Sequence, residues 1–370
     1  MPHADPLAHG ARVLTVCNAC RYCEQFCPVF PAIEQRVVFE RVDLAYLANL
    51  CHNCGECLYA CQYAPPHEFG INVPRTLAEI RLDSYEHYAW PRPLAALLRR
   101  SAPLTTAGLV VAFTALFLAA SALTAGGAAW RAQPGGDFYA VVPHAVMVAM
   151  FGSVFALAVL ALAIGVARFA GDVRRSSVEA GRSQTGGRGW RAIRDALTLR
   201  HLHAAGADCV SGEEERRPWR RWCHHLVLGG FLLCFASTTA AAIYHGVFGW
   251  LAPYGITSLP VVLGTLGGIG LAAGSSGLWV LYGKRDPSLG DPAQGAGDRS
   301  FLALLFATTV TGLALLALRT SAAMGLLLIV HLATVLALFV TMPYGKFVHG
   351  FYRAAALVVF ERERDPASPH

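Results

Sequence analysis

The chain has 370 residues, of which 55% are hydrophobic and 15% charged, and its mean hydropathy is +0.43. An apolar excess of this size, concentrated after residue 100, argues against a water-soluble enzyme and is typical of a membrane protein. The formal net charge of +6 could indicate nucleic-acid binding, but arginines beside membrane spans explain it better, and we expect no nucleic-acid partner.

Residues 1–98 have no long apolar run and carry two quartets of cysteines. Each quartet reads C-x2-C-x2-C-x3-C, the spacing with which bacterial ferredoxins bind two [4Fe–4S] clusters. In such proteins the last cysteine of each quartet ligates the cluster of the other quartet. The predicted ligands of cluster 1 are therefore Cys17, Cys20, Cys23 and Cys61, and those of cluster 2 are Cys51, Cys54, Cys57 and Cys27.

Structural zinc and disulfides are the alternatives for these cysteines. Two uninterrupted runs of four with the same spacing exceed what two tetrahedral zinc sites need. Disulfides require an oxidising compartment, and residues 1–16 lack the apolar run of an export signal. One departure from the ferredoxin pattern is that Pro28 follows the first quartet, whereas Gln62 follows the second.

Two helices are expected around the second quartet. Apolar residues recur at near-helical spacing over Arg36–Leu50, which predicts a helix between the two ligand loops. A second helix is predicted to start near Pro74, because proline is favoured in the first turn. His67 and His87 have no partner motif and are interpreted as surface or capping residues.

Aromatic and basic residues at Trp90–Pro93 and Arg99–Arg100 mark the entry into the membrane. Six apolar segments follow that are long enough, or nearly so, to cross about 30 Å of hydrocarbon as helices. None contains Asp, Glu, Lys or Arg, and the fifth is the shortest. The predicted spans are Leu104–Thr124, Val141–Ala167, Leu226–Leu251, Ser258–Tyr282, Phe301–Leu318 and Ala322–Met342.

The connection from Ala170 to Arg221 holds eleven arginines, whereas the segments Gly126–Ala140 and Gly249–Thr257 on the other side hold one, Arg131. Because basic residues stay on the cytoplasmic side, this connection, both termini and the cluster module are predicted to face the cytoplasm of a bacterial inner membrane. Within the connection, Ser176–Trp190 is expected to be disordered and Arg216–Arg221 to be an interfacial anchor.

The predicted organisation is mainly α: a ferredoxin-like helical module that holds two clusters, followed by a six-helix transmembrane bundle. Its divisions are residues 1–98, 99–169, 170–221, 222–360 and 361–370. Three cysteines lie outside the quartets. Cys223 and Cys234 are read as small buried apolar residues, and Cys209 has no assigned role.

Ionisable residues inside membrane spans are candidates for function, because unpaired polar groups in hydrocarbon are costly. His331 and His349 are 18 residues apart and share one face if their helix is continuous. On the third span, His224 lies nearer in phase to His245 than its neighbour His225 does.

The two helices run in opposite directions, so His224 pairs in depth with His349, and His245 with His331. Facing histidines at one depth are how a helical bundle holds b haem, and two depths suggest one or two haems. The alternative is that these histidines hydrogen-bond between helices. His144 competes as an outer ligand, His201 and His203 are expected in solvent, and Gly229, Gly230 and Gly325 are expected to let a macrocycle approach the backbone.

The chain resembles tricarballylate utilisation protein B, also called the citrate utilisation B family. The resemblance covers nearly the whole chain and includes the double cluster motif. Pro343–His349 is also similar to the last-helix haem motif of the membrane subunits of nitrate reductase and heterodisulfide reductase. The other segments that carry the resemblance are Arg194–Arg200, Cys209, Arg221–His225, Gly230–Phe235, Ala252–Gly255, Leu259–Pro260, Gly264–Gly270 and Pro343–Gly350.

The resemblance implies a membrane electron-transfer protein with two [4Fe–4S] clusters and b haem. It would reoxidise the flavin of an FAD-dependent, tricarballylate dehydrogenase-like partner and reduce membrane quinone. The chain has no G-x-G-x-x-G after a strand, so substrate oxidation is expected on the partner. Tyr344 and Lys346 are candidates for the quinone site by position only. The alternatives are a cluster-bearing redox sensor or membrane anchor, and more weakly a transporter.

Overall fold

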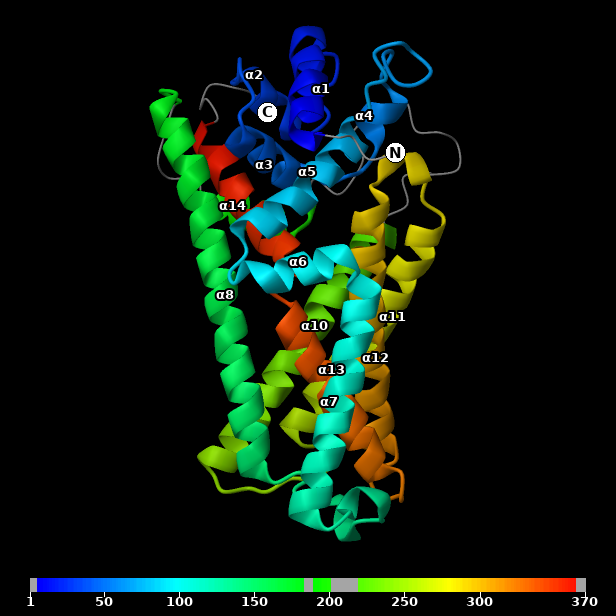
Figure 1. Cartoon of the computed structure of the whole chain (residues 1–370). Coiled ribbons are helices and arrows are strands. Elements are labelled where there is room, and N and C mark those ends of the chain that lie inside the picture. The colour runs from blue at the N-terminus through cyan, green and yellow to red at the C-terminus, as the bar shows by residue number, and fades with distance from the viewer. Residues whose placement is uncertain (1–4, 183–188, 201–218, 364–370) are drawn as a thin grey trace.

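The computed structural model describes residues 5–182, 189–200 and 219–363. These residues form a helical head above a bundle of long helices, and both ends of the chain lie at the head (Figure 1). Within these ranges the regular elements are α-helices and short 3-10 turns, and no strand occurs. The expected mainly α architecture is therefore confirmed, while Cys209, His201 and His203 lie outside the described residues.

The head begins with five helices. They are α1 (Pro6–Cys20), α2 (Val29–Glu34), α3 (Arg41–Leu50), α4 (Glu56–Tyr59) and α5 (Val73–Tyr88). The Asp5 carboxylate caps α1 by accepting from the amides of Leu7 and Ala8, and the Asn72 side chain caps α5 by accepting from the Arg75 amide. The helix predicted near Pro74 is thus confirmed.

The helix predicted over Arg36–Leu50 forms only from Arg41 onward. The reason is that Arg36 is 1% exposed and its guanidinium is held by tertiary contacts, while Val37 and Val38 are exposed. Nε of Arg36 lies 2.8 Å from Asp43, and Nη2 lies 3.0 Å from Glu363 near the end of the described chain. The Tyr46 ring covers the guanidinium carbon at 4.4 Å. This buried network fixes the segment as a loop.

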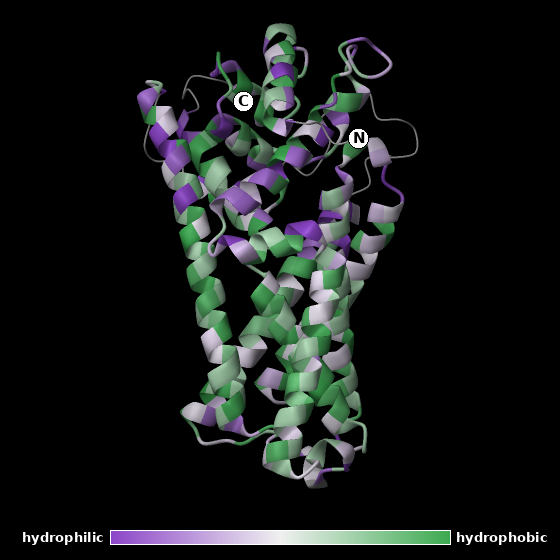
Figure 2. Cartoon of the chain, in the orientation of Figure 1, coloured by the Kyte–Doolittle hydropathy of each residue, from purple (hydrophilic) through white to green (hydrophobic). Residues whose placement is uncertain are grey.

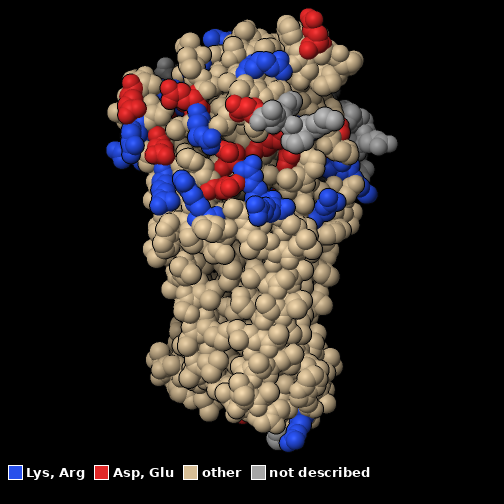
Figure 3. Space-filling model, viewed as in Figure 1, with Lys and Arg blue, Asp and Glu red and all other residues tan. Residues whose placement is uncertain are grey.

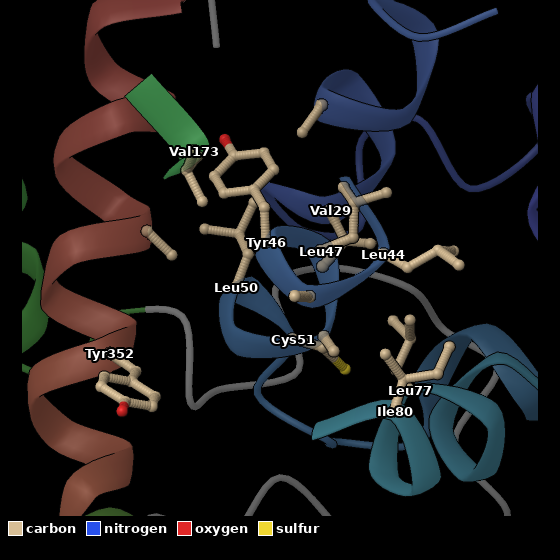
Figure 4. Close-up of a cluster of buried hydrophobic side chains, with 14 of the residues drawn as sticks. Val29, Leu44, Tyr46, Leu47, Leu50, Cys51, Leu77, Ile80, Val173 and Tyr352 are labelled. Atoms are coloured by element: carbon tan, nitrogen blue, oxygen red, sulfur yellow. The ribbon is translucent and has the colours of Figure 1, made fainter. Parts of the chain in front are cut away.

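The core of the head contains residues from distant parts of the chain (Figure 4). Leu47 and Leu50 of α3 belong to one buried cluster with Val173 of α8 (His144–Glu179) and Tyr352 of α14 (Val348–Glu363). Ala192 of α9 (Gly189–Leu197) joins the same cluster. The head is therefore built from the N-terminal module together with segments that the sequence analysis divided from it at residues 98 and 361.

The expectation of disorder over Ser176–Trp190 is wrong at both ends. The second membrane helix, α8, continues to Glu179, and α9 starts at Gly189. The physical reason is tertiary: Ser177 is buried and its hydroxyl donates to the Glu363 carboxylate, while Arg182 lies 3.2 Å from Asp43. Residues 183–188 lie outside the described part.

Among the described residues, six helices are long and apolar enough to cross a membrane. They lie below the head, where hydrophobic residues dominate (Figure 2) and charged side chains are nearly absent from the visible face (Figure 3). The six predicted spans are thus borne out as membrane-compatible helices. They are α7 (Ala102–Ala125), α8, α10 (Trp219–Gly246), α11 (Leu259–Gly283), α12 (Pro292–Ala317) and α13 (Met324–Thr341).

The nine-residue helix α6 (Arg92–Arg100) lies at the boundary between head and bundle, at a steep angle to α7 (Figure 1). Leu94 and Leu97 are exposed on it, and Arg99 and Arg100 lie in its last turn. An amphipathic helix at this position is typical of the membrane interface, where apolar side chains enter lipid and arginines face the headgroups. It occupies the predicted entry into the membrane.

The chain from His331 to His349 is not one continuous helix, so the condition for these residues to share one face is not met. α13 ends at Thr341 and α14 begins at Val348, with turns around Pro343 between them. Proline removes a backbone donor and clashes with the preceding turn, so the chain leaves the helix there. α14 then enters the head (Figure 1). His349 therefore lies where the bundle meets the head rather than on the α13 axis.

Candidate cluster and haem sites

The first quartet follows the end of α1. Cys17 and Cys20 are in its last turn, and Arg21 ends the helix in the left-handed conformation with its amide donating to the Cys17 carbonyl at 2.9 Å. Cys23 lies in the turn that follows, and Cys27 precedes α2, which Pro28 starts. The helix end and the tight turn together bring three thiols toward one side of the chain.

The second quartet follows the end of α3. Cys51 ends that helix in an extended conformation, Asn53 has φ 53°, and Gly55 has φ 95° before α4 carries Cys57. A side chain at Gly55 would be strained by this φ, and its Cβ would lie 2.8 Å from Cδ2 of Leu289. The glycine is therefore required for the loop to turn at this point.

The eight thiols fall into two groups of four. Cys17 lies near enough to Cys20, Cys23 and Cys61 for their charges to act on it. Cys57 is similarly influenced by Cys27, Cys51 and Cys54, and also by Cys23 of the other group. The two groups have the membership predicted for cluster 1 and cluster 2 and lie side by side, although the ligand roles themselves stay a prediction.

A small pocket opens beside the first group, and its lining includes Cys17, Cys20, Cys23, Cys57 and Cys61. In the part of the chain that the structure describes, no three His, Cys, Asp or Glu side chains converge closely enough to hold a single metal ion.

Burial opposes ionisation of these thiols. It raises the pKa of Cys17 to about 12, with the charges of Cys61, Cys23 and Cys20 adding to the effect, and it raises the pKa of Cys23 to about 12 as well. Burial also raises the pKa values of Cys27 and Cys57. Four thiolates packed this closely need a positively charged partner, and iron supplies that charge when bound. The donor set therefore fits two clusters.

His224 and His349 lie beneath the second group. Nδ1 of His224 is 2.8 Å from the Arg220 carbonyl, and Nδ1 of His349 is within hydrogen-bonding distance of the Lys346 carbonyl. Holding Nδ1 on a carbonyl fixes the ring and leaves Nε2 for a metal. The charge of His224 acts on His349, and burial lowers the pKa of His349, which keeps that ring neutral. The rings of His224 and His349 are therefore the candidates to hold one haem between them.

The outer histidines are arranged differently from the predicted pair. The His245 ring stacks on His144, with centroids 3.7 Å apart, and the Tyr139 hydroxyl lies 3.5 Å from Nδ1 of His245. Nδ1 of His331 instead faces α12, 3.1 Å from both the Thr308 carbonyl and the Thr311 hydroxyl. His144, the competing candidate, is thus the residue that stacks on His245, and the pairing of His245 with His331 around a haem stays a prediction.

Two of the three glycines that were expected beside a haem macrocycle, Gly230 and Gly325, lie against the backbone of neighbouring segments. A Cβ on Gly230 would lie 2.7 Å from the Gly267 carbonyl oxygen, so Gly230 sets the contact between α10 and α11. A Cβ on Gly325 would lie 2.5 Å from the Ala129 carbonyl oxygen. Only Gly229 has open space beside it. Cys223 is buried against α11, as expected of a small apolar residue, and Cys234 is partly buried near Gly267.

Sequence reasoning missed four arginines that contact the loop of the second quartet. Arg81, Arg220, Arg285 and Arg353 all donate to main-chain carbonyls of residues 48–53. Their signal in the sequence was a set of basic residues beside apolar segments. Such residues are expected at any membrane boundary, so the pattern alone does not single them out.

Comparison with known proteins gives consistent results over the whole chain. A family model described as Citrate utilization protein B matches residues 95–369, and a second, described as its Fer4-like domain, matches residues 10–87. The chain is 48% identical over 361 residues to Citrate utilization protein B of Escherichia coli. That alignment covers 97% of this chain and 93% of the relative. No solved structure matches.

Proposed function

Because this chain belongs to the citrate utilization protein B family, whose Fer4-like domain suggests an iron–sulfur electron-transfer role, we propose a defined route for those electrons. They enter from the reduced flavin of a dehydrogenase that oxidises a tricarboxylate, such as tricarballylate. They then pass through two [4Fe–4S] clusters and b haem to membrane quinone. Clusters and haem, when bound, supply one-electron steps between a two-electron flavin and a two-electron quinone.

The observation that carries this proposal is the order of the candidate sites from head to membrane. Two groups of four thiols lie in the head, and the His224–His349 pair lies beneath the second group, where the bundle begins. The cysteines would hold both clusters, and the histidines would hold the haem through Nε2. The head itself is helical in its described parts and has no nucleotide-binding sheet, so the flavin belongs to a partner.

The pocket beside Cys17 marks the face where that partner would dock. Tyr22, on its rim, is 63% exposed, and α1 stands at the end of the head farthest from the bundle (Figure 1). We place this head in the cytoplasm, because Val173 and Ala192 from the described parts of the arginine-rich connection pack into the core of the head. A soluble flavoprotein would reach the pocket without contacting the membrane.

The test is to purify the full chain in detergent and to measure iron, pyridine haemochrome and a dithionite-minus-air spectrum on one sample. About eight non-haem irons per chain and b-type bands are expected, as two cubanes and a haem require. The reduced protein should then be reoxidised by a soluble quinone analogue. A Cys54→Ser variant should lose about half of the iron. Clusters that the quinone fails to reoxidise would overturn the proposal and favour a sensor or anchor.

A further inference from the structure

The loop of the second cysteine quartet is fixed to the membrane bundle by guanidinium groups. The Cys51 carbonyl accepts from Nη2 of Arg353 at 2.7 Å and from Nη2 of Arg81 at 2.9 Å. The Asn53 carbonyl accepts from Nη2 of Arg285 at 2.8 Å and from Nη1 of Arg220 at 3.4 Å. We call Arg81, Arg220, Arg285 and Arg353 the arginine collar.

Three members of the collar come from the bundle side of the molecule. Arg220 is in the first turn of α10, Arg285 follows the end of α11, and Arg353 lies on α14 after the last span. Arg81 reaches the loop from α5 of the head. The pocket beside Cys17, in contrast, is lined by residues of the head itself, including Tyr22, Gln62 and Tyr63. The two thiol groups therefore differ in how they are joined to the membrane part.

Arg353 also connects the loop to the predicted haem ligand. His349 and Arg353 are four residues apart on α14, so they lie on the same face of that helix. The charges of Arg353 and Lys346 act on His349, and the Cys51 thiol acts on Arg353. One helix thus carries both a contact to the Cys51 loop and a side chain of the His224–His349 pair.

We infer that cluster 2 is the exit cluster and that the arginine collar is a positioning device for it, holding the Cys51 loop against the His224–His349 site and favouring the reduced form of that cluster. This inference rests on the proposed function. The step moves one electron: cluster 2 is oxidised, ferric haem is reduced to ferrous haem, and no bond or proton changes place.

The charge balance around the loop supports this role. A cluster gains a negative charge on reduction, so nearby positive charge stabilises the reduced form. Among the described residues, the acidic groups near the collar are Asp298, which is paired with Lys346 at 2.7 Å, Asp286 near Arg285, and Glu56, which lies buried in the ligand loop. A favoured reduced state at cluster 2 draws electrons from cluster 1, which lies at the entry pocket, toward the membrane.

The test is a redox titration of the purified holoprotein, with electron paramagnetic resonance as the readout. The variants compared with the wild type are Arg353→Gln, Arg353→Lys and Arg285→Gln. The signal missing from Cys54→Ser identifies cluster 2. We expect each glutamine variant to shift the reduction equilibrium of cluster 2 by roughly tenfold toward the oxidised form, as neighbouring charges do in protonation equilibria. Cluster 1 should not shift, and Arg353→Lys should keep most of the wild-type value.

Arg319→Gln is the matched control, because Nη1 of Arg319 donates to the Tyr254 carbonyl at 2.8 Å at the far end of the bundle. The rate of haem reduction, measured by freeze-quench, should be lower in Arg353→Gln and unchanged in Arg319→Gln. Unshifted cluster 2 potentials in both glutamine variants, or a shift confined to cluster 1, would overturn the inference. The titration uses no quinone, so a wild-type protein that titrates normally but reduces no quinone would refute the proposed function alone.

Discussion

Replacing Arg36 by leucine should destabilise the head more than any single exposed substitution. The guanidinium of Arg36 holds Asp43 at 2.8 Å, Glu363 at 3.0 Å and the Ala32 carbonyl at 2.7 Å. Asp43 and Glu363 are 4% exposed each, so Arg36→Leu leaves two carboxylates buried with Arg182 as their remaining cation. Breaking a buried ion pair by removing one partner costs about 3–5 kcal/mol.

The control is Arg41→Leu, which removes an ion pair with Asp83 at 2.6 Å in which the arginine side chain is 46% exposed. An exposed pair contributes about 0–1 kcal/mol. Pulse proteolysis in a urea series measures the unfolding free energy of the head in both variants, with the gel band of the intact head as the readout. The expected difference in unfolding free energy is at least about 2 kcal/mol, the gap between those two ranges. Equal midpoints for Arg36→Leu and Arg41→Leu would show that the network does not support the head.

Gly55→Ala should cost about half of the iron, since φ 95° and the 2.8 Å approach of Leu289 oppose any side chain there. Gly171→Ala in α8, where a Cβ would meet nothing within 4 Å, should keep the iron. His349→Ala should abolish the b-type bands while His225→Ala retains them, as read by pyridine haemochrome; full bands in His349→Ala would contradict the haem assignment. In iron-free protein, alkylation of Cys17 and Cys23 should be slow at about pH 8, because only the thiolate reacts. The rate should rise about tenfold per pH unit up to the pKa of about 12 that burial gives both thiols. Mass spectrometry measures the rates, and a plateau near pH 9 would refute the raised pKa.

Local patterns were sufficient for the parts of the fold that depend on a short window of sequence. The six apolar helices follow from hydropathy, since a span must satisfy its own backbone in lipid. The start of α5 follows from Pro74 and its Asn72 cap. The grouping of the thiols follows from spacing, because a helix end at Cys20 and another at Leu50 present each quartet as a compact loop.

Features that depend on distant contacts were not predictable in this way. The Arg36 loop breaks a helical pattern because Glu363, far along the chain, holds the guanidinium. The extension of α8 to Glu179 depends on Ser177 meeting the same carboxylate. His245 and His331 match in depth, but depth does not determine which neighbouring helix a ring faces, and the structure turns His331 toward α12. The collar was hidden because arginines at membrane boundaries are common.

The length of α8 has a consequence for how the protein is made. Its 36 residues extend about 54 Å as a continuous rod, from the far end of the bundle into the core of the head. Phe169 and Val173 on this rod share one buried cluster with Tyr352 and Phe360 of α14, a helix that is synthesised after all six spans. The cysteines at the start of the chain are synthesised first, but the apolar surface around them closes only after every span is inserted. Maturation of the head is therefore a late event, coupled to completion of the membrane part.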